Sequence, residues 1–179
     1  MKVYVMRHGQ TCWNACDRIQ GDSKTRLSEL GKKQAQTSAE NFKNTKIDVI
    51  FASPTMRTMQ TANFVNKFHN VKIIKDDRIK EIDQGDFKTR FYKDLTKEEE
   101  YSVEVSREGY NQETWDEVNK KTIDFVKFLK QTNYGSILIV THGFNAICLE
   151  NLFLNKKVDY KNYAYRENFK NAEIRGYEI

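Results

Sequence analysis

Short apolar runs alternate with segments of helical periodicity, and this alternation constrains the 179-residue chain more than any other feature. Residues 2–6, 47–52 and 71–75 are short and β-rich, and residues 136–141 form the most apolar run. Between them, apolar side chains recur every three or four residues, which indicates amphipathic helices. Because strands that are apolar on both faces are typical of helix-covered parallel sheets, we expect an α/β fold. The expected architecture is a three-layer sandwich with a mainly parallel central sheet and helices on both faces.

Capping residues predict where two of the helices begin. Ser28 is a candidate N-cap for a helix that extends to about residue 42, although Gly31 weakens its first turn. Ser53 followed by Pro54 predicts a second start, with the hydroxyl as the cap and proline at the first helical position. This second helix is expected to end near residue 68.

The whole chain, residues 1–179, is expected to form one domain, because its length lies within the usual range for a single core. A strongly amphipathic helix is expected from Trp115 to before residue 133, another over about 144–154, and a last strand from about 172. The charged stretch 83–112 has no clear period, so we expect an irregular or partly helical insertion there. Its central part, about 86–111, is interpreted as a small cap.

Composition excludes several classes of protein. Hydrophobic residues make up 39% and charged residues 31% of the chain, as in ordinary globular proteins. No apolar run approaches the roughly 18 residues of a membrane span, and the start has no signal-peptide layout. The three cysteines show no pairing pattern, which fits a reducing compartment. We therefore expect a cytoplasmic protein with no membrane partner.

The formal charge of +5 attracts anions, either small phosphorylated molecules or nucleic acid. The basic residues are scattered among acidic ones, and the chain has no aromatic–basic RNA signature and no base-reading helix motif. We expect no nucleic-acid partner.

Two histidine–glycine pairs, His8-Gly9 and His142-Gly143, stand where predicted strands end. In parallel sheets, ligands bind at the carboxyl edge of the strands. Both pairs should therefore face one crevice, although most of the chain separates them. A single histidine at a strand end is more often a structural group than a nucleophile.

Further segments accompany these pairs, and in this combination the chain resembles the histidine phosphatase superfamily, the phosphoglycerate mutase-like proteins. The resemblance extends over about the whole chain, in the order and spacing of the family. The matching segments are Arg7-His8-Gly9-Gln10-Thr11-Cys12-Trp13-Asn14, Gln20-Gly21-Asp22, Leu27-Ser28-Glu29-Leu30-Gly31, Ser53-Pro54-Thr55-Met56-Arg57-Thr58, Glu81-Ile82-Asp83-Gln84-Gly85-Asp86-Phe87 and Val140-Thr141-His142-Gly143.

The resemblance implies that His8 attacks phosphorus and that Glu81 is the general acid and base. It also implies that phosphate is bound by Arg7, Asn14, Arg57 and His142, and more weakly suggests Thr11, Gln20, Gly21 and Gly143 near the substrate. These residue types suit the chemistry, because a phosphoryl group in transfer needs fixed donors and positive charge around its oxygens.

Alternatives remain for two of these residues, and one rival motif is present. Asn14 can instead be a helix cap, and Asp83 is the substitute for Glu81 as the acid. Cys12 and Arg18 have the spacing of cysteine-dependent phosphatases, but the residues between them include no glycine to let the loop wrap around phosphate.

The preferred hypothesis is that the protein is a phosphatase. The expected substrate is a small phosphorylated metabolite, with no cofactor, and no metal because no metal-ligand spacing is present. The short segment after Glu81 favours hydrolysis, since a mutase must shield its phosphohistidine from water. Phosphoglycerate mutase activity and a catalytically silent phospho-ligand or protein-binding module are the alternatives. We expect a monomer or homodimer, and the sequence leaves the physiological substrate open.

Overall fold

The computed structural model describes residues 1–156 and 169–179, and within them a single sheet has the strand order β3-β2-β4-β1-β5. Strands β1, β4, β2 and β3 run parallel, and β5 is antiparallel to β1. The mainly parallel sheet expected from the sequence is confirmed. The strands are β1 (Lys2–Arg7), β2 (Val49–Ala52), β3 (Lys72–Lys75), β4 (Ser136–Thr141) and β5 (Ile174–Glu178).

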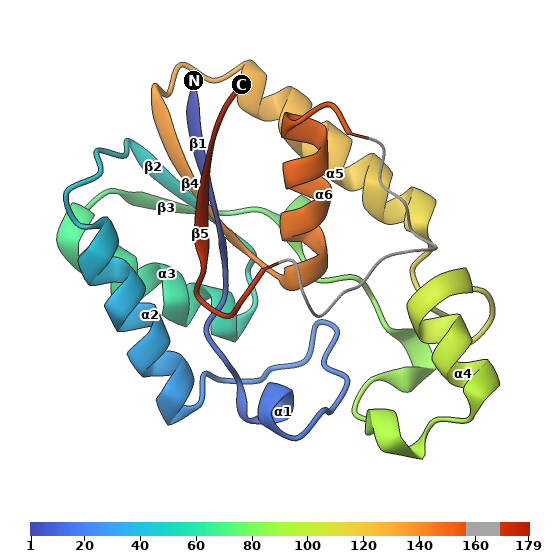
Figure 1. The fold of residues 1–179 in the computed structure, drawn as a ribbon. Coiled ribbons are helices and arrows are strands. Elements are labelled where there is room, and N and C mark those ends of the chain that lie inside the picture. Colours follow the sequence, from blue (N-terminus) through green and yellow to red (C-terminus); the bar gives the residue numbers. More distant parts are fainter. Residues whose placement is uncertain (157–168) are drawn as a thin grey trace.

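Helices cover both faces of the sheet (Figure 1). Helices α2 (Glu29–Phe42) and α3 (Met56–His69) lie on one face, and α5 (Trp115–Lys130) and α6 (Gly143–Phe153) lie on the other. Successive residues of β4 enter the two cores alternately: Ile137 and Ile139 pack with α5 and α6, while Leu138 and Val140 pack with α2 and α3. Each fully buried aliphatic side chain contributes about 1.5–3 kcal/mol to folding.

One of the two predicted helix starts is confirmed and the other is wrong. Ser28 caps α2, because its Oγ accepts the N–H of Gly31 at 3.0 Å. Helix α3 begins at Met56 with Thr55 at the N-cap position, so neither Ser53 nor Pro54 belongs to it. The hydroxyl of Ser53 hydrogen-bonds instead to a distant histidine ring, and this tertiary contact takes the place of capping.

Glycine in the first turn of α2 has a packing cause. A Cβ on Gly31 would lie 1.9 Å from the carbonyl oxygen of Gln10, and a Cβ on Gly9 would lie 2.4 Å from the carbonyl oxygen of Gly31. The loop that follows β1 thus runs directly against the first turn of α2. Gly31 lowers intrinsic helix stability by about 1 kcal/mol relative to alanine, but no larger residue fits there.

The segment between β3 and α5 is partly helical, as expected. It contains the turns η1 (Asp77–Ile79), η2 (Gly85–Phe87) and η3 (Tyr92–Asp94), the short helix α4 (Lys97–Tyr101) and the π-helical turn η4 (Ser102–Ser106). Phe87 and Val103 pack with Ile19 in a small core of their own. This core joins the segment to the loop after helix α1 (Cys12–Ala15).

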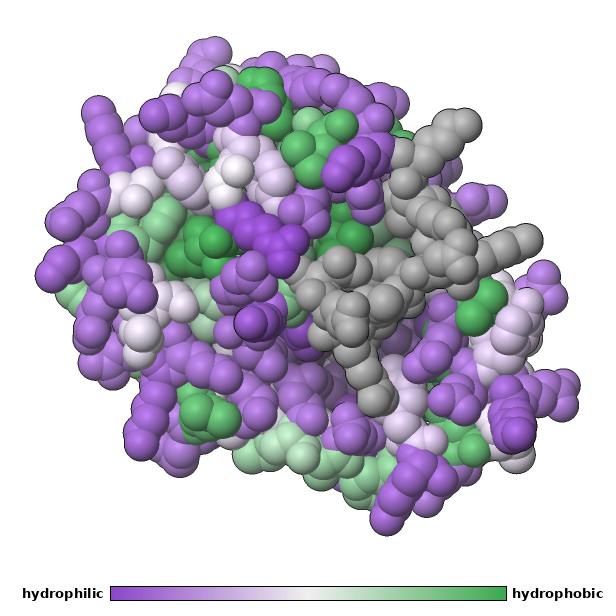
Figure 2. All heavy atoms as spheres, in the orientation of Figure 1, coloured by the Kyte–Doolittle hydropathy of each residue, from purple (hydrophilic) through white to green (hydrophobic). Residues whose placement is uncertain are grey.

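Hydrophilic side chains cover most of the face shown in Figure 2, and apolar ones form small separate patches. None of the helices in residues 1–156 and 169–179 has the length and apolar character needed to cross a membrane.

Candidate active site

Neighbouring parallel strands bring two histidines together. Arg7, the last residue of β1, lies opposite Thr141, the last residue of β4, so His8 and His142 leave the sheet side by side. Their ring centroids are 5.2 Å apart, and the exposed fractions of the two residues are 2% and 0%. The expectation that both histidines meet at the carboxyl edge of the sheet is confirmed.

Hydrogen bonds define the protonation state of the His8 ring. Its Nδ1 lies 2.7 Å from the carbonyl oxygen of Gly9, which can only accept, so Nδ1 carries the proton. Nε2 accepts the Nε–H of Arg57 at 3.2 Å. Burial lowers the pKa of His8 well below its usual range, and the charges of Arg57 and Arg7 lower it further. The ring is therefore neutral near pH 7, with its lone pair on Nε2.

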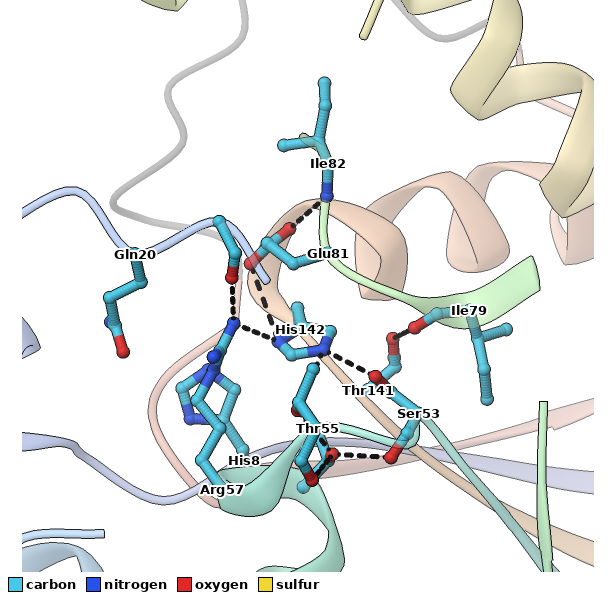
Figure 3. A network of polar contacts seen from close by, with 12 residues as sticks. His8, Gln20, Ser53, Thr55, Arg57, Ile79, Glu81, Ile82, Thr141 and His142 are labelled. Atoms are coloured by element: carbon cyan, nitrogen blue, oxygen red, sulfur yellow. Dashed lines mark hydrogen bonds and ion pairs between the residues drawn. The ribbon is translucent and has the colours of Figure 1, made fainter. Parts of the chain in front are cut away.

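Arg57 enters the site from the first turn of α3 and is completely buried. Besides His8, its guanidinium donates to Nδ1 of His142 at 3.0 Å and to the carbonyl oxygens of Gly21 at 2.6 Å and Ser23 at 3.1 Å. Figure 3 shows its contact with the His142 ring. Because the fork is held in one orientation, it presents its charge to the space beside both histidines.

His142 has the opposite tautomer to His8. Its Nδ1 accepts from Arg57, so the proton of the neutral ring is on Nε2, which donates to Oγ of Ser53 at 2.8 Å. Burial lowers the pKa of His142 well below its usual range, with smaller effects of Arg57 and of His8. Ser53, which sequence reasoning interpreted as a helix cap, therefore orients a ring of the site (Figure 3).

Glu81 reaches the same place from the segment that follows η1. Its carboxyl group is 7% exposed, Oε1 accepts the N–H of Ile82 at 3.1 Å, and Oε2 lies 3.7 Å from Nδ1 of His142. Burial raises the pKa of Glu81, although the charge of Arg57 and the Ile82 N–H act in the opposite direction. A carboxyl group in this environment holds its proton at a higher pH than an exposed one.

Asp83, the substitute acid considered from the sequence, has a different environment. Partial burial alone would raise its pKa, but the N–H of Gly85 and the ammonium group of Lys88 more than offset this, and the pKa is lowered. Lys88 Nζ lies 2.9 Å from the Asp83 carboxylate. Asp83 is thus an ionised partner in a salt bridge, so the structure favours Glu81 as the acid.

Asn14 and Arg7 lie at the edge of the buried site. Thr11, not Asn14, is the N-cap residue of α1; Asn14 is the third residue of the helix, and its Oδ1 accepts the N–H of Thr11 at 3.1 Å in a capping box. Nη1 of Arg7 donates to the carbonyl oxygen of Phe169 at 2.6 Å. Both side chains line a cavity of about 600 Å³ beside the site. Their binding of phosphate stays a prediction.

The weaker candidates lie around this centre. The hydroxyls of Thr11 and Thr25 both bond Oε1 of Gln20, at 2.8 and 2.7 Å, which ties the loop together, and Gln20 itself lies apart from the histidines in Figure 3. Gly21 contributes its carbonyl oxygen to Arg57. Gly143 is the first residue of α6, directly after His142.

Sequence reasoning missed part of the cavity wall. Four basic residues of the segment after β3, Arg78, Lys80, Lys88 and Arg90, each form an ion pair with a neighbouring carboxylate. The cavity is lined by further residues that were not among the predicted site residues. These are Arg18, Tyr92, Glu100, Glu104, Arg107 and Trp115.

In the parts of the chain that the structure describes, no three side chains of histidine, cysteine, aspartate or glutamate gather as a metal site requires. The positive charge at the centre comes from Arg57 and Arg7.

Comparison with known proteins identifies the family of the chain and its fold. Residues 3–178 match the model of the histidine phosphatase superfamily (branch 1). Over 100 residues the chain is 39% identical to a probable phosphoglycerate mutase GpmB of Yersinia pestis, a match that covers 56% of this chain and 46% of that protein. The chain thus spans about half the length of the curated relatives it matches.

Solved structures share the fold. Bacillus stearothermophilus YhfR has a TM-score of 0.87 at 22% identity and covers 99% of this chain and 91% of its own. A mycobacterial glucosyl-3-phosphoglycerate phosphatase has a TM-score of 0.82 at 23% identity, with 98% and 88% covered. A putative alpha-ribazole-5'-P phosphatase of Escherichia coli has a TM-score of 0.81 at 22% identity, with 88% and 81% covered. The expected phosphoglycerate mutase-like fold is confirmed.

Proposed function

This chain belongs to the histidine phosphatase superfamily (branch 1), and from that membership and the geometry of the site we propose that it hydrolyses phosphomonoesters through a phosphohistidine on His8. The observation that carries the proposal is the state of the His8 ring, which is neutral, with Nδ1–H held by Gly9 and the lone pair of Nε2 beside Arg57. An imidazole in this state is a nucleophile and afterwards a good leaving group.

In the first step, Nε2 of His8 forms a bond to phosphorus while the bond from phosphorus to the ester oxygen breaks. The leaving oxygen takes the proton of Glu81, whose raised pKa keeps that proton available. In the second step the Glu81 carboxylate takes a proton from water, the water oxygen bonds to phosphorus, and the bond to His8 breaks. Inorganic phosphate leaves and both groups return to their starting states.

The guanidinium groups of Arg7 and Arg57 stabilise the phosphoryl oxygens in both steps. Arginine forks match phosphate oxygens with paired N–H donors and supply the positive charge that a metal ion supplies in other phosphoryl-transfer sites. Asn14 and His142 are the other two side chains of the proposed phosphate-binding set. His142 needs a proton on Nδ1 to donate, and a bound phosphate dianion favours that protonation, because nearby negative charge raises the pKa of an imidazole.

Phosphoglycerate mutase activity is the second candidate, because the 39% identical relative is named a probable mutase. Hydrolysis is preferred since the segment of residues 86–111, which we propose as a cap, is short for shielding a phosphohistidine from water. Incubation with 3-phosphoglycerate and a bisphosphoglycerate primer separates the two: hydrolysis releases phosphate, and mutase activity gives 2-phosphoglycerate.

The proposal extends to the setting of the protein, a cytoplasmic monomer or homodimer that acts on a small phosphorylated metabolite. Its three cysteines support a reducing compartment, since Cys12 and Cys16 are free and exposed and Cys148 is free and buried.

The test is a panel of phosphate esters, with and without chelator, followed by free phosphate and by acid-labile phosphate on the protein. His8→Ala should abolish the labelled phosphoprotein and lower turnover by at least about 1,000-fold. His69→Ala is the matched control, because His69 lies at the far end of α3 from Arg57 and packs on Phe42. Turnover of His8→Ala close to that of wild type would refute the phosphohistidine.

A further inference from the structure

The cavity of about 600 Å³ beside the phosphate-binding residues has walls from four distant parts of the chain. Helix α1 and its following loop form one wall, α4 and η4 another, and the first residues of α5 and α6 the rest. Figure 1 shows these elements around the carboxyl edge of the sheet. Arg7, Asn14 and Ile82 belong to the lining, so the cavity adjoins both the proposed phosphate site and the acid Glu81. The alcohol part of an ester bound at His8 would extend into this space.

Aromatic rings form much of the lining, namely Trp13, Tyr92, Trp115 and Phe144. The Trp115 ring is fixed, because its Nε1–H donates to the carbonyl oxygen of Val105 at 2.7 Å and the ring lies 4.7 Å from that of Phe144. Rigid aromatic surfaces bind flat apolar groups with little loss of side-chain entropy. This wall suits a ring on the leaving alcohol.

Charged groups along the wall disfavour a second anion. Asp17, Glu100 and Glu104 line the cavity, are exposed, and form no ion pair with any residue in 1–156 or 169–179. Carboxylates in this position repel a carboxylate or a second phosphate on the substrate.

The two arginines of this wall, Arg18 and Arg107, offset this effect only in part, because three carboxylates outnumber them and the donors of Arg107 are engaged. Arg107 is 2% exposed and donates to four oxygens, those of Glu113, Gln84, Val103 and Asp83. The guanidinium of Arg18 lies 4.3 Å from the centroid of the Trp13 ring and donates its Nε–H to the carbonyl oxygen of Thr89.

From the rings and the carboxylates together, we propose that the cavity is a leaving-group site for monoesters whose alcohol carries an aromatic or heteroaromatic ring and no second anionic group. This inference rests on the proposed phosphatase function and specifies the substrate class of the same site. In this proposal Trp115 selects substrates with a ring on the leaving alcohol, and Glu100 and Glu104 select against substrates with a second anionic group.

Three esters that differ by one feature each test the proposal: benzyl phosphate, 4-carboxybenzyl phosphate and ethyl phosphate. We expect kcat/KM for benzyl phosphate to exceed that for each of the others by at least about tenfold, from aromatic contact in one comparison and charge repulsion in the other. If no ester of this set or of the wider panel releases phosphate, the proposed function fails. If the three esters react at equal rates, the function stands and the leaving-group site is refuted.

The double variant Glu100→Gln with Glu104→Gln should narrow the benzyl to carboxybenzyl ratio by roughly fivefold, the size expected for two exposed charges. Glu98→Gln with Glu108→Gln changes the net charge equally at exposed positions of the same segment that do not line the cavity, and it should leave the ratio unchanged. Equal effects of the two double variants would overturn the charge assignment.

Trp115→Leu should narrow the benzyl to ethyl ratio by about tenfold, because it removes the fixed ring. Tyr101→Leu is the control, since Tyr101 is exposed in α4 and does not line the cavity. A ratio unchanged by Trp115→Leu in a protein with a wild-type melting curve would contradict the ring assignment. If Trp115→Leu does not fold, Trp13→Leu serves the same comparison.

Discussion

Replacing Glu81 by glutamine should reduce catalysis and at the same time stabilise the protein. The change keeps the size of a side chain that is 7% exposed, and the amide oxygen of glutamine can still accept the Ile82 N–H that Oε1 now accepts at 3.1 Å. What disappears is the acidic proton and the charge that replaces it at higher pH. Stability and activity therefore report on the same carboxyl group in opposite directions.

The sign of the stability change follows from the raised pKa of Glu81. At a pH below the pKa that Glu81 has in the unfolded chain, its carboxyl group is protonated in both the folded and the unfolded state, and it does not lower the free energy of unfolding. As the pH rises through the folded pKa, the protein loses stability, by about 1.4 kcal/mol for each unit between the two pKa values. Glutamine has no such loss, and a gain of about 1 kcal/mol corresponds to about 2–4 °C in Tm for a chain of this size.

Thermal unfolding of wild type and Glu81→Gln at pH 8 and pH 4 measures this effect. We expect the variant to melt at the higher temperature at pH 8 and the difference to vanish near pH 4. A variant that melts below wild type at pH 8 would show that the ionised carboxylate is a favourable partner in the site, and the reasoning from burial would be wrong.

The effect of Glu81→Gln on catalysis is measured with two phosphate esters. On ethyl phosphate, whose leaving alkoxide needs a proton, loss of the general acid should lower kcat by about 10²–10⁴-fold. On p-nitrophenyl phosphate, formation of the phosphohistidine should slow much less, because the leaving phenolate is already stable. Loss of the base then slows the second step, and a burst of about one nitrophenolate per site should precede slow turnover. Equal loss on both esters without a burst would contradict the role of Glu81.

Four further predictions concern the same centre. Ser53→Ala removes the 2.8 Å acceptor of the buried Nε2–H of His142 and leaves it only the longer contact with Oγ1 of Thr55 at 3.5 Å, so differential scanning calorimetry should show a loss of about 1–3 kcal/mol, and an unchanged Tm would contradict the bond. Arg57→Lys keeps the charge but loses the fork, and steady-state kinetics should show kcat reduced by about 10²–10³-fold, whereas near-wild-type kcat would mean that charge alone suffices. Burial lowers the pKa of His8 and of His142, so the unfolded chain takes up protons first as the pH falls below about 6.5. Urea unfolding at pH 7 and pH 5 should show stability falling with pH, and less steeply for His142→Gln than for wild type; equal slopes would argue against burial of a neutral ring. Gly31→Ala should destabilise by about 1–3 kcal/mol despite better helix propensity, because its Cβ would lie 1.9 Å from a carbonyl oxygen, and a more stable variant would refute that packing.

Much of the fold could be predicted because its strands are locally apolar and its helices are periodic. The run 136–141 was predicted with the limits that β4 has, and the meeting of His8 and His142 follows from two parallel strands that end at one edge. Ser53 shows where local reasoning fails. Serine before proline is typical of a helix start, and only the packing of residues 89 positions apart gives its hydroxyl another partner.

The cavity wall was missed for a related reason. Arg107 stands in a stretch without a regular period, whereas Trp115 is the first residue of a predicted helix; both side chains are placed by carbonyl oxygens that no pattern identifies in advance. The partners of Lys88 could not be predicted from the sequence either. Its salt bridges with Asp22 and Asp83 depend on the folding of two separate loops.

The carbonyl oxygens of Gly21 and Ser23 that hold Arg57 have a consequence for product release. An anion that takes the same N–H groups displaces neutral acceptors, so binding is an exchange of partners. Its net gain is the difference between a guanidinium hydrogen bond to a phosphate anion and one to a neutral carbonyl, about 1–2 kcal/mol each. In the proposed reaction, inorganic phosphate would be oriented while bound but not trapped, because the loop carbonyls would return as it departs. Such an exchange would let a completely buried arginine serve in repeated turnover.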